Sequence, residues 1–217
     1  AKRLEVPVRI VRIDHTKMQS LEVVVRGSDV IYSPSNSSVI IQLPLPKRRF
    51  YSLLTKIPYE KDVDMLSEGA KRKFYTGDFS RVSPVIRSIE YFIESNKLKI
   101  EAKNILIVGF GALVGKPISF YLEKQGAKVR ITENYSPDKV GSESLIVLSS
   151  DVPNLVKGED LPEGCNVIDF GSSVLNGKTV GNLDMNSDTS RLGIVSPSPG
   201  GMGPLVVRFL LMNHLGI

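Results

Sequence analysis

In the second half of the chain, strand-length apolar runs recur in a regular order. Each run is short and apolar throughout, which is typical of strands buried on both faces of a parallel sheet. Helical spacing over Leu113–Gln125 follows the first run. This order predicts a doubly wound parallel α/β sheet. The predicted strands are Ile105–Gly109, Ala127–Glu133, Ser144–Ser149, Cys165–Phe170 and the shorter Gly193–Ser196.

The first half of the chain has a less regular pattern. Val6–Ile13 alternates apolar and basic residues, and Leu21–Val25 and Asp29–Tyr32 also favour strands. Val39–Leu43 is the strongest strand prediction here, and the prolines that follow it would end a ladder. Phe50–Ile57 favours a short helix. These elements predict an N-terminal α/β lobe separate from the parallel sheet.

A helix is expected to join the two lobes. Ser83 and Pro84 predict its start, with a capping hydroxyl followed by proline at the first helical position. A last helix over Leu205–Leu215 is expected to begin at Pro204. The expected domains are an N-terminal lobe at 1–82, a second lobe at 83–200 and a closing helix at 201–217.

The chain has 217 residues and a net charge of +5, and its composition argues against a membrane span, a disulfide, a nucleic-acid motif and a metal site. No apolar run has the length of a membrane span and no signal-peptide core is present, so the cytoplasm is the expected location. Cys165 is the one cysteine, which excludes an internal disulfide and favours a buried small hydrophobe. Basic clusters lack the interleaved aromatics of nucleic-acid motifs. His15 and His214 have no second ligand at metal spacing, so no metal is expected.

Three glycines separate the first strand of the second half from the helix after it. Gly109, Gly111 and Gly115 form a G-x-G-x-x-x-G spacing. Missing Cβ atoms let a pyrophosphate approach the backbone, while free N–H groups and the helix dipole favour its negative charge. The same spacing also fits a tight strand–helix turn without a ligand. The turn is therefore a candidate dinucleotide cradle.

Further motifs occur in a fixed order along the chain. Q-L-P-L-P, P-Y-E-K-D-V-D and P-G-G-M-G-P form a specific combination, and V-G-K-P and V-G-N-L-D lie between the second and the third. In this order they resemble motifs of the bifunctional methylenetetrahydrofolate dehydrogenase/cyclohydrolases. By this resemblance the chain is identified as a shortened and divergent member of that family. The motifs occupy Gln42–Pro46, Pro58–Asp64, Val114–Pro117, Val180–Asp184 and Pro199–Pro204.

The resemblance implies a fold and an activity. It implies two lobes, with a tetrahydrofolate derivative in the cleft between an N-terminal α/β lobe and a Rossmann-like C-terminal lobe that binds NAD or NADP. The activity it implies is that of an oxidoreductase of one-carbon metabolism, which oxidises 5,10-methylenetetrahydrofolate by hydride transfer. A hydrolase step from the methenyl product to 10-formyltetrahydrofolate normally follows. The resemblance also implies a homodimer formed through the cofactor lobe.

The resemblance also assigns a substrate site. Gln42 matches the active-site glutamine of the family, and Asp64 can accept a two-point fork from neighbouring N–H donors of a pterin. Turn capping is the alternative role for Asp62 and Asp64. The residues implied at the substrate are Gln42, Pro44, Asp64, Pro199, Gly200 and Gly201, with Gln42 and Asp64 also taking part in catalysis.

The catalytic lysine of the family has no clear counterpart. In the family it lies on a helix, four residues after a tyrosine, and neither that helix nor Y-x-x-x-K is found between Ile13 and Val39. Lys17 is the candidate stand-in, with a solvated surface lysine as the alternative. Met65 also replaces the glycine usual after K-D-V-D. We therefore expect the dehydrogenase without the cyclohydrolase. A fully bifunctional enzyme and a non-catalytic folate- or nucleotide-binding homologue are the alternatives.

The residues around the glycine turn favour NAD over NADP. Phe110 and Gly111 stand where NADP-using relatives carry arginine and serine, and an aromatic ring cannot pair with a 2′-phosphate. Glu133 ends the second strand, where a carboxylate accepts from ribose hydroxyls and repels a phosphate. Arg130 lies within that strand and is less well placed for a phosphate. The cofactor residues are Gly109, Phe110, Gly111, Val114, Gly115 and Glu133.

Overall fold

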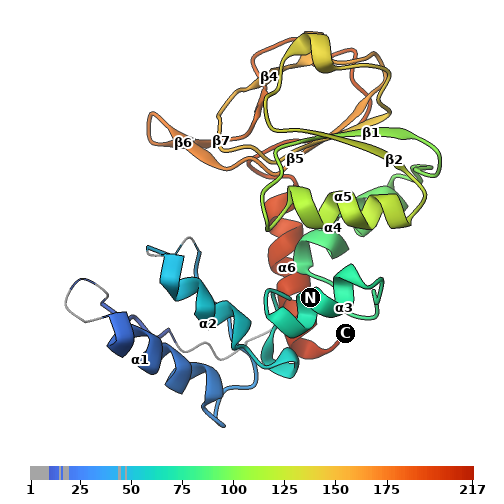
Figure 1. The fold of residues 1–217 in the computed structure, drawn as a ribbon. Coiled ribbons are helices and arrows are strands. Elements are labelled where there is room, and N and C mark those ends of the chain that lie inside the picture. Colours follow the sequence, from blue (N-terminus) through green and yellow to red (C-terminus); the bar gives the residue numbers. More distant parts are fainter. Residues whose placement is uncertain (1–9, 15, 17–19, 44, 47) are drawn as a thin grey trace, which may run out of the picture. The chain divides into compact units, whose positions relative to one another are not determined.

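The structure, a computed structural model, describes residues 10–14, 16, 20–43, 45–46 and 48–217. The chain divides into two compact units, Ala1–Thr76 and Gly77–Ile217 (Figure 1). The domain limits expected from the sequence, at 1–82, 83–200 and 201–217, stay a prediction.

The second unit is built on a five-stranded parallel sheet, as the apolar runs predict. Its strand order is β2-β1-β3-β5-β9, and each neighbouring pair is parallel. The apolar residues of β1 are fully buried, because layers of structure cover both faces of the strand. The strands are β1 (Asn104–Val108), β2 (Lys128–Thr132), β3 (Leu145–Leu148), β5 (Asn166–Asp169) and β9 (Val195–Ser196).

Helices cover one face of this sheet (Figure 1). α4 (Pro84–Ser95) and α5 (Gly115–Lys124) lie on that face, and α6 (Met202–Leu215) packs along α4. The predicted start of α4 is confirmed, because the Ser83 hydroxyl accepts the N–H of Ile86 at 3.4 Å. α6 begins before Pro204, which is tolerated in a first helical turn because the N–H groups there have no partner within the helix.

A smaller layer of strands covers the opposite face. β4 (Val156–Lys157) and β8 (Leu183–Asp184) pair in parallel and pack on the apolar side chains of β1, β3 and β5. Within the described residues, α5 is the only α-helix that connects two strands of the main sheet. The connections from β2 to β3 and from β3 to β5 contain short 3-10 turns, η3 (Pro137–Lys139) and η4 (Gly158–Asp160). The parallel α/β sheet is confirmed, and its second covering layer is strands rather than helices.

Two further strands form a hairpin in the second unit (Figure 1). β6 (Ser173–Leu175) and β7 (Lys178–Val180) are antiparallel. Asn176 and Gly177 join them with φ values of +52° and +74°. Positive φ at both central residues is the conformation that an Asn-Gly hairpin turn favours.

The described part of the first unit is mainly helical. Its elements pack around a small apolar cluster, to which two helices, the Val39 segment and the residues just after α2 contribute. The cluster consists of Ile31, Val39, Leu53, Leu54 and Ile57. The elements are α1 (Ser20–Tyr32), η1 (Arg48–Tyr51), α2 (Ser52–Thr55), η2 (Tyr59–Lys61) and α3 (Glu68–Tyr75). The short helix predicted over 50–57 is thereby confirmed.

Two predicted strands in the first unit are wrong. Leu21–Val25 and Asp29–Tyr32 both lie within α1, whose buried face includes Gly27 and Ile31, four residues apart. Gly27 is a packing position and not a turn, since a Cβ there would lie 2.9 Å from the Cδ1 of Leu53. Contact between α1 and α2 therefore outweighs the strand preference of the valine run.

The predicted strand Val39–Leu43 is reduced to a single bridge. Val39 pairs in parallel with Asp62, and the N–H of Val39 donates to the Lys61 carbonyl at 2.9 Å. Of the strand predicted over Val6–Ile13, residues 10–13 are described and have no regular secondary structure. The described part of the first unit therefore holds one bridge in place of the expected strands.

Candidate functional site

The glycine turn after β1 is shaped by close backbone approaches. Gly109 has a φ of +96°, and a Cβ on it would lie 2.6 Å from the carbonyl oxygen of Ser149. A Cβ on Gly115 would overlap the carbonyl oxygen of Gly109. A Cβ on Gly111 would meet no described atom within 4 Å. Gly109 and Gly115 are therefore required by the fold, whereas Gly111 borders open space, as a pyrophosphate cradle requires.

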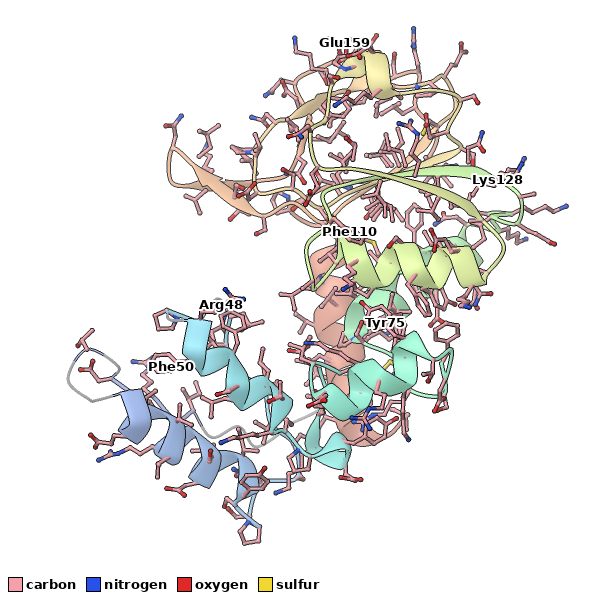
Figure 2. The ribbon with its side chains drawn as sticks, in the orientation of Figure 1. Arg48, Phe50, Tyr75, Phe110, Lys128 and Glu159 are labelled. Atoms are coloured by element: carbon pink, nitrogen blue, oxygen red, sulfur yellow. The ribbon has the colours of Figure 1, made fainter. Side chains whose placement is uncertain are left out.

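This turn lies at the switch point of the sheet. β2 flanks β1 on one side and β3 flanks it on the other, and ligands of open α/β sheets bind at the carboxyl edge of such a point. Phe110 is 40% exposed on the turn, at the opposite end of the sheet from Lys128 (Figure 2). Val114 is the N-cap residue of α5, whose first turn has no acidic residue. The positive potential of this helix terminus is therefore not cancelled locally.

Glu133 follows β2 at the same edge of the sheet. The Gly109 N–H donates to the carbonyl of Thr132 at 2.8 Å, so the residue after Thr132 lies beside the glycine turn. The Glu133 side chain is exposed. Arg130 is engaged elsewhere, in an ion pair with the buried carboxylate of Glu143. The structure therefore brings the glycine turn and Glu133 together and holds the Arg130 guanidinium on Glu143.

The P-G-G loop leads into α6. Gly200 has a φ of +99°, and a Cβ there would meet nothing among the described atoms within 4 Å. A Cβ on Gly201 would overlap the carbonyl oxygen of Pro197, and the Gly201 N–H donates to that oxygen at 2.9 Å. Pro199 and Gly200 form the outer part of this tight loop. Its glycines are therefore explained by backbone geometry, with open space beside Gly200.

Asp169, at the end of β5, is a buried carboxylate that the sequence analysis missed. It is 1% exposed and accepts the N–H groups of Gly171 at 2.7 Å and Leu183 at 2.8 Å. Burial raises the pKa of Asp169, and these backbone donors act against the rise. The Ser198 hydroxyl donates to the Gly171 carbonyl, so Asp169 and the P-G-G loop hold the same segment. Its place at the end of a predicted strand was the one available signal.

Asn182, in the V-G-N-L-D motif, is also fully buried. Its Oδ1 accepts the Ser150 N–H at 2.9 Å, while its Nδ2 donates to the carbonyls of Ser150 at 3.0 Å and Val152 at 2.7 Å. Two acceptors and one donor are satisfied together by an amide and not by a carboxylate. Asn182 therefore fits its surroundings, where an aspartate would leave two carbonyls without a donor.

In the first unit, the two carboxylates of K-D-V-D have different surroundings. Asp62 is fully buried and accepts the N–H groups of Leu66 at 3.1 Å and Ser67 at 2.6 Å. Ser67 is in turn the N-cap residue of α3. Turn capping is therefore the role of Asp62. No residue in the described part of the chain donates a hydrogen bond to the half-buried Asp64 carboxylate.

The surroundings of Asp64 favour its neutral form. Burial, and after it the negative charge of Asp62, raise the pKa of Asp64 to about 6. A carboxylate without donors is poorly satisfied by the fold alone. A perturbed pKa together with unused acceptor positions is common at binding sites. Asp64 is therefore the candidate ligand residue of the motif.

Gln42 lies on the segment paired with this turn. It follows Val39 in the same direction as Asp64 follows Asp62, because the bridge between the two segments is parallel. Gln42 is exposed, and its Nε2 donates to the carbonyl of Leu43 at 3.1 Å. Gln42 and Asp64 therefore lie on neighbouring segments of one unit. The candidates Lys17 and Pro44 lie outside the described residues.

The backbone conformation of Met65 explains why glycine is usual at this position of the motif. Its φ is +58°, in the left-handed region that glycine adopts without steric cost. The Met65 side chain is 7% exposed. This chain therefore combines a strained backbone position with a buried apolar side chain directly after Asp64.

A helix does lie in the interval where the sequence analysis found none. α1 reads S-L-E-V-V-V-R-G-S-D-V-I-Y and contains no lysine. The expectation that this interval holds no helix is therefore corrected. The tyrosine-to-lysine spacing of the family is still not found there.

Metal-binding clusters and membrane-spanning helices are absent from the described residues. No group of three or more His, Cys, Asp or Glu side chains among them could hold a metal ion. None of the helices they form is long and apolar enough to cross a membrane.

The parallel sheet, the open glycine turn at its switch point and the carboxylate at the end of β2 define a dinucleotide-binding domain. Residues 84–217 match the family model described as tetrahydrofolate dehydrogenase/cyclohydrolase, NAD(P)-binding domain. The chain belongs to the methylenetetrahydrofolate dehydrogenase/cyclohydrolase family, as its motifs predict.

Known relatives extend this similarity over most of the chain. It is 34% identical over 188 residues to the bifunctional protein FolD of Mycoplasmopsis synoviae (strain 53), covering 82% of this chain and 68% of the relative. It is 33% identical over 185 residues to that of Hydrogenobaculum sp. (strain Y04AAS1), covering 82% and 66%. The crystal structure of the bifunctional enzyme FolD from Campylobacter jejuni has a TM-score of 0.82 at 24% identity, covering 92% and 73%. The chain thus spans part of the length of these relatives.

Proposed function

We propose that this chain oxidises 5,10-methylenetetrahydrofolate to 5,10-methenyltetrahydrofolate, with NAD as the hydride acceptor. The observation that carries the proposal is the open space at Gly111, beside the N-terminus of α5 and close to Glu133. Family membership supplies the substrate class. The proposal concerns the activity of this chain, which spans part of the length of its relatives.

In this proposal the cofactor residues bind and orient. When bound, the nicotinamide supplies the acceptor for the hydride. The backbone at Gly111 and the N-terminus of α5 hold the pyrophosphate, while Gly109 and Gly115 allow α5 to approach β1 closely. Val114 begins the helix and Phe110 offers an apolar surface beside the turn. Orientation of the two reacting carbons is the main requirement for hydride transfer.

The proposed substrate residues orient the folate. Asp64 has two acceptor oxygens without a donor among the described residues, which suits the neighbouring N–H groups of a pterin edge. Gln42, on the adjacent segment, supplies an amide that can both donate and accept. The family motifs alone assign four further residues to the substrate site: Pro44, Pro199, Gly200 and Gly201.

NAD is preferred over NADP in this proposal. Glu133 stands at the end of β2, where a carboxylate can accept from both ribose hydroxyls and repel a 2′-phosphate. The cation nearest in sequence, Arg130, is ion-paired with Glu143. These two observations support the preference.

Hydrolysis of the methenyl product is proposed to be slow. Water addition and ring opening need proton transfers, and α1 offers no lysine for them. The Lys61 amine donates to the carbonyls of Ser33 and Ile31. Lys17 keeps the role of candidate stand-in, and full bifunctionality through it is an outcome of the test below.

The remaining parts of the proposal come from the family resemblance alone. They are tetrahydrofolate derivatives as the small-molecule partners, a homodimer formed through the cofactor lobe, and action in the cytoplasm.

The test is a cofactor comparison with the purified protein. Absorbance of the reduced nicotinamide is followed with methylenetetrahydrofolate and either NAD or NADP. We expect growth with NAD, little growth with NADP, and a methenyl band that decays no faster than in an enzyme-free control. Accelerated decay would establish the bifunctional enzyme. No growth with either cofactor overturns the proposal and favours a non-catalytic binding protein.

A further inference from the structure

We infer that Lys61 is a positioning residue for Asp64, because its ammonium group closes the carboxyl end of α1 and thereby fixes the K-D-V-D turn. The inference deepens the proposed function and rests on it for its kinetic test. Its structural part depends on the first unit alone.

The Lys61 side chain reaches a helix that is distant in the sequence. Its Nζ donates to the carbonyl of Ser33 at 2.8 Å and to that of Ile31 at 3.4 Å. α1 ends at Tyr32 and has no basic residue in its last turn. The carboxyl end of a helix carries partial negative charge and unpaired carbonyls, both of which an ammonium group satisfies. Lys61 therefore supplies the cation that the last turn of α1 lacks.

The main chain of Lys61 is fastened to the same stretch. Its carbonyl accepts the N–H of Val39 at 2.9 Å, and Val39 forms the parallel bridge with Asp62. The segment between α1 and Val39 is itself ordered, because the Asn36 amide donates to the carbonyl of Val30 at 2.8 Å. Lys61 is thus held at two points, one through its side chain and one through its backbone. Together they close a ring that runs from α1 through Val39 and back.

The other side of the turn is fixed by Asp62. Its carboxylate accepts the N–H groups of Leu66 and Ser67, at the start of α3. Lys61 therefore ties the turn to the end of α1, and Asp62 ties it to the start of α3. Asp64 lies within the loop that Asp62 closes onto Leu66 and Ser67, with no donor among the described residues. Acceptor oxygens held in this way need little further ordering when a ligand with two donors arrives.

The kinetic test begins with Lys61→Met, which keeps the apolar stem and removes the donors. We expect the KM for methylenetetrahydrofolate to rise about tenfold, as for the loss of a charge-assisted hydrogen bond. The kcat is expected to change less, and the KM for NAD to stay the same. A fall in kcat alone would indicate a merely structural role and overturn the inference.

A double-mutant cycle tests whether Lys61 acts through Asp64. In the Asp64→Asn background, Lys61→Met is expected to cause no further rise in the folate KM, because the group that Lys61 positions is already lost. If the rise in folate KM of the double variant equals the product of the two single rises, the inference is overturned. Lys56→Met is the matched control, since Lys56 is an exposed lysine of the same unit, at the C-cap of α2. Its KM is expected to equal that of the wild type.

Lys61→Arg keeps the test open if Lys61→Met does not fold. A guanidinium can donate to the same two carbonyls, so its folate KM is expected to stay within about twofold of the wild type. A rise as large as that of Asp64→Asn overturns the inference.

Amide hydrogen exchange separates this inference from the proposed function. Lys61→Met is expected to speed exchange at Leu66 and Ser67, while β1 stays protected. Unchanged exchange at those two amides overturns the inference whether or not the enzyme is active. An inactive wild type that still shows the exchange effect overturns the proposed function and keeps the ordering of the turn by Lys61.

Discussion

The Gly109 N–H donates to the carbonyl of Thr132 at 2.8 Å, and this bond sets the first glycine of the turn beside Glu133. Exchanging Glu133 for glutamine should therefore alter cofactor choice. We expect the KM for NAD to rise about tenfold and the preference for NAD over NADP to shrink, because an amide no longer repels a phosphate. Steady-state rates with both cofactors measure this. Glu123→Gln, at an exposed position of α5, is the control, and an unchanged cofactor ratio contradicts the assignment.

The glycine turn offers a matched pair of substitutions. Gly115→Ala should lower the free energy of unfolding by about 2 kcal/mol, because the new methyl group would overlap the Gly109 carbonyl. Gly111→Ala should change it by less than about 0.5 kcal/mol yet raise the KM for NAD, because its methyl group would stand where the pyrophosphate approaches. Urea unfolding and cofactor kinetics check both. An unaltered KM in Gly111→Ala would show that no ligand uses this space.

The raised pKa of Asp64 predicts a pH dependence of substrate binding. Only the charged carboxylate accepts two hydrogen bonds from a pterin edge without a proton conflict. Since the pKa is raised to about 6, the KM for methylenetetrahydrofolate should fall as the pH rises through that value and then level off. Initial rates at saturating NAD over this range measure it. Asp64→Asn should have a high KM that does not depend on pH. A wild-type KM that stays constant over this pH range would argue against Asp64 as the ligand.

The raised pKa of Asp64 also predicts that replacing this carboxyl stabilises the fold in a pH-dependent way. A carboxyl whose pKa is raised on folding favours the fold below its unfolded value of 3.8 and loses that contribution as the pH rises through about 6. Asp64→Asn should therefore be more stable than the wild type at pH 8, by up to about 3 kcal/mol. The gain should shrink as the pH falls toward 4. Urea unfolding at both pH values tests this, and a gain independent of pH would contradict it.

At Met65, glycine should be better tolerated than alanine, the reverse of the usual order. Its φ of +58° strains any residue with a Cβ, and its side chain is buried. Both variants lose the buried side chain, at a cost of about 2 kcal/mol. The free energy of unfolding should be about 1 kcal/mol higher for Met65→Gly than for Met65→Ala, because glycine relieves the strain. Met185→Ala is the exposed control. Equal stability of the two Met65 variants would mean that the turn relaxes.

The sequence predicted the second unit well because its signals are local. A run such as Ile105–Val108 is typical of a strand buried on both faces, and the glycines after it indicate a tight turn before a helix. α1 was misassigned because the valine run favours strands locally, whereas the packing of Gly27 on Leu53 decides the matter. The strand predicted from Val39 has one bridge, since its partner segment turns away at Asp62.

The site residues named from motifs stay predictions, and the sequence analysis missed the residues that meet from distant segments of the chain. Asp64 was named from the K-D-V-D motif that carries the family resemblance, and Glu133 from its place at the end of the second predicted strand. The hydrogen bonds of Asp169 and Asn182 join segments far apart in the chain, and no local pattern encodes them. The contact of Lys61 with the end of α1 spans 28 residues for the same reason. Long-range polar contacts are set by the fold and cannot be read from local sequence.

Cys165 gives the second unit a built-in reporter. It is the only thiol in the chain, it packs 1% exposed against the strand-covered face of the sheet, and burial raises its pKa to about 12. The thiolate is the nucleophile that attacks a thiol reagent, so Cys165 can react only when this layer has separated from the sheet. When reclosing is faster than labelling, the labelling rate in the native protein therefore reports the fraction of molecules in which that layer is open, without any engineered probe.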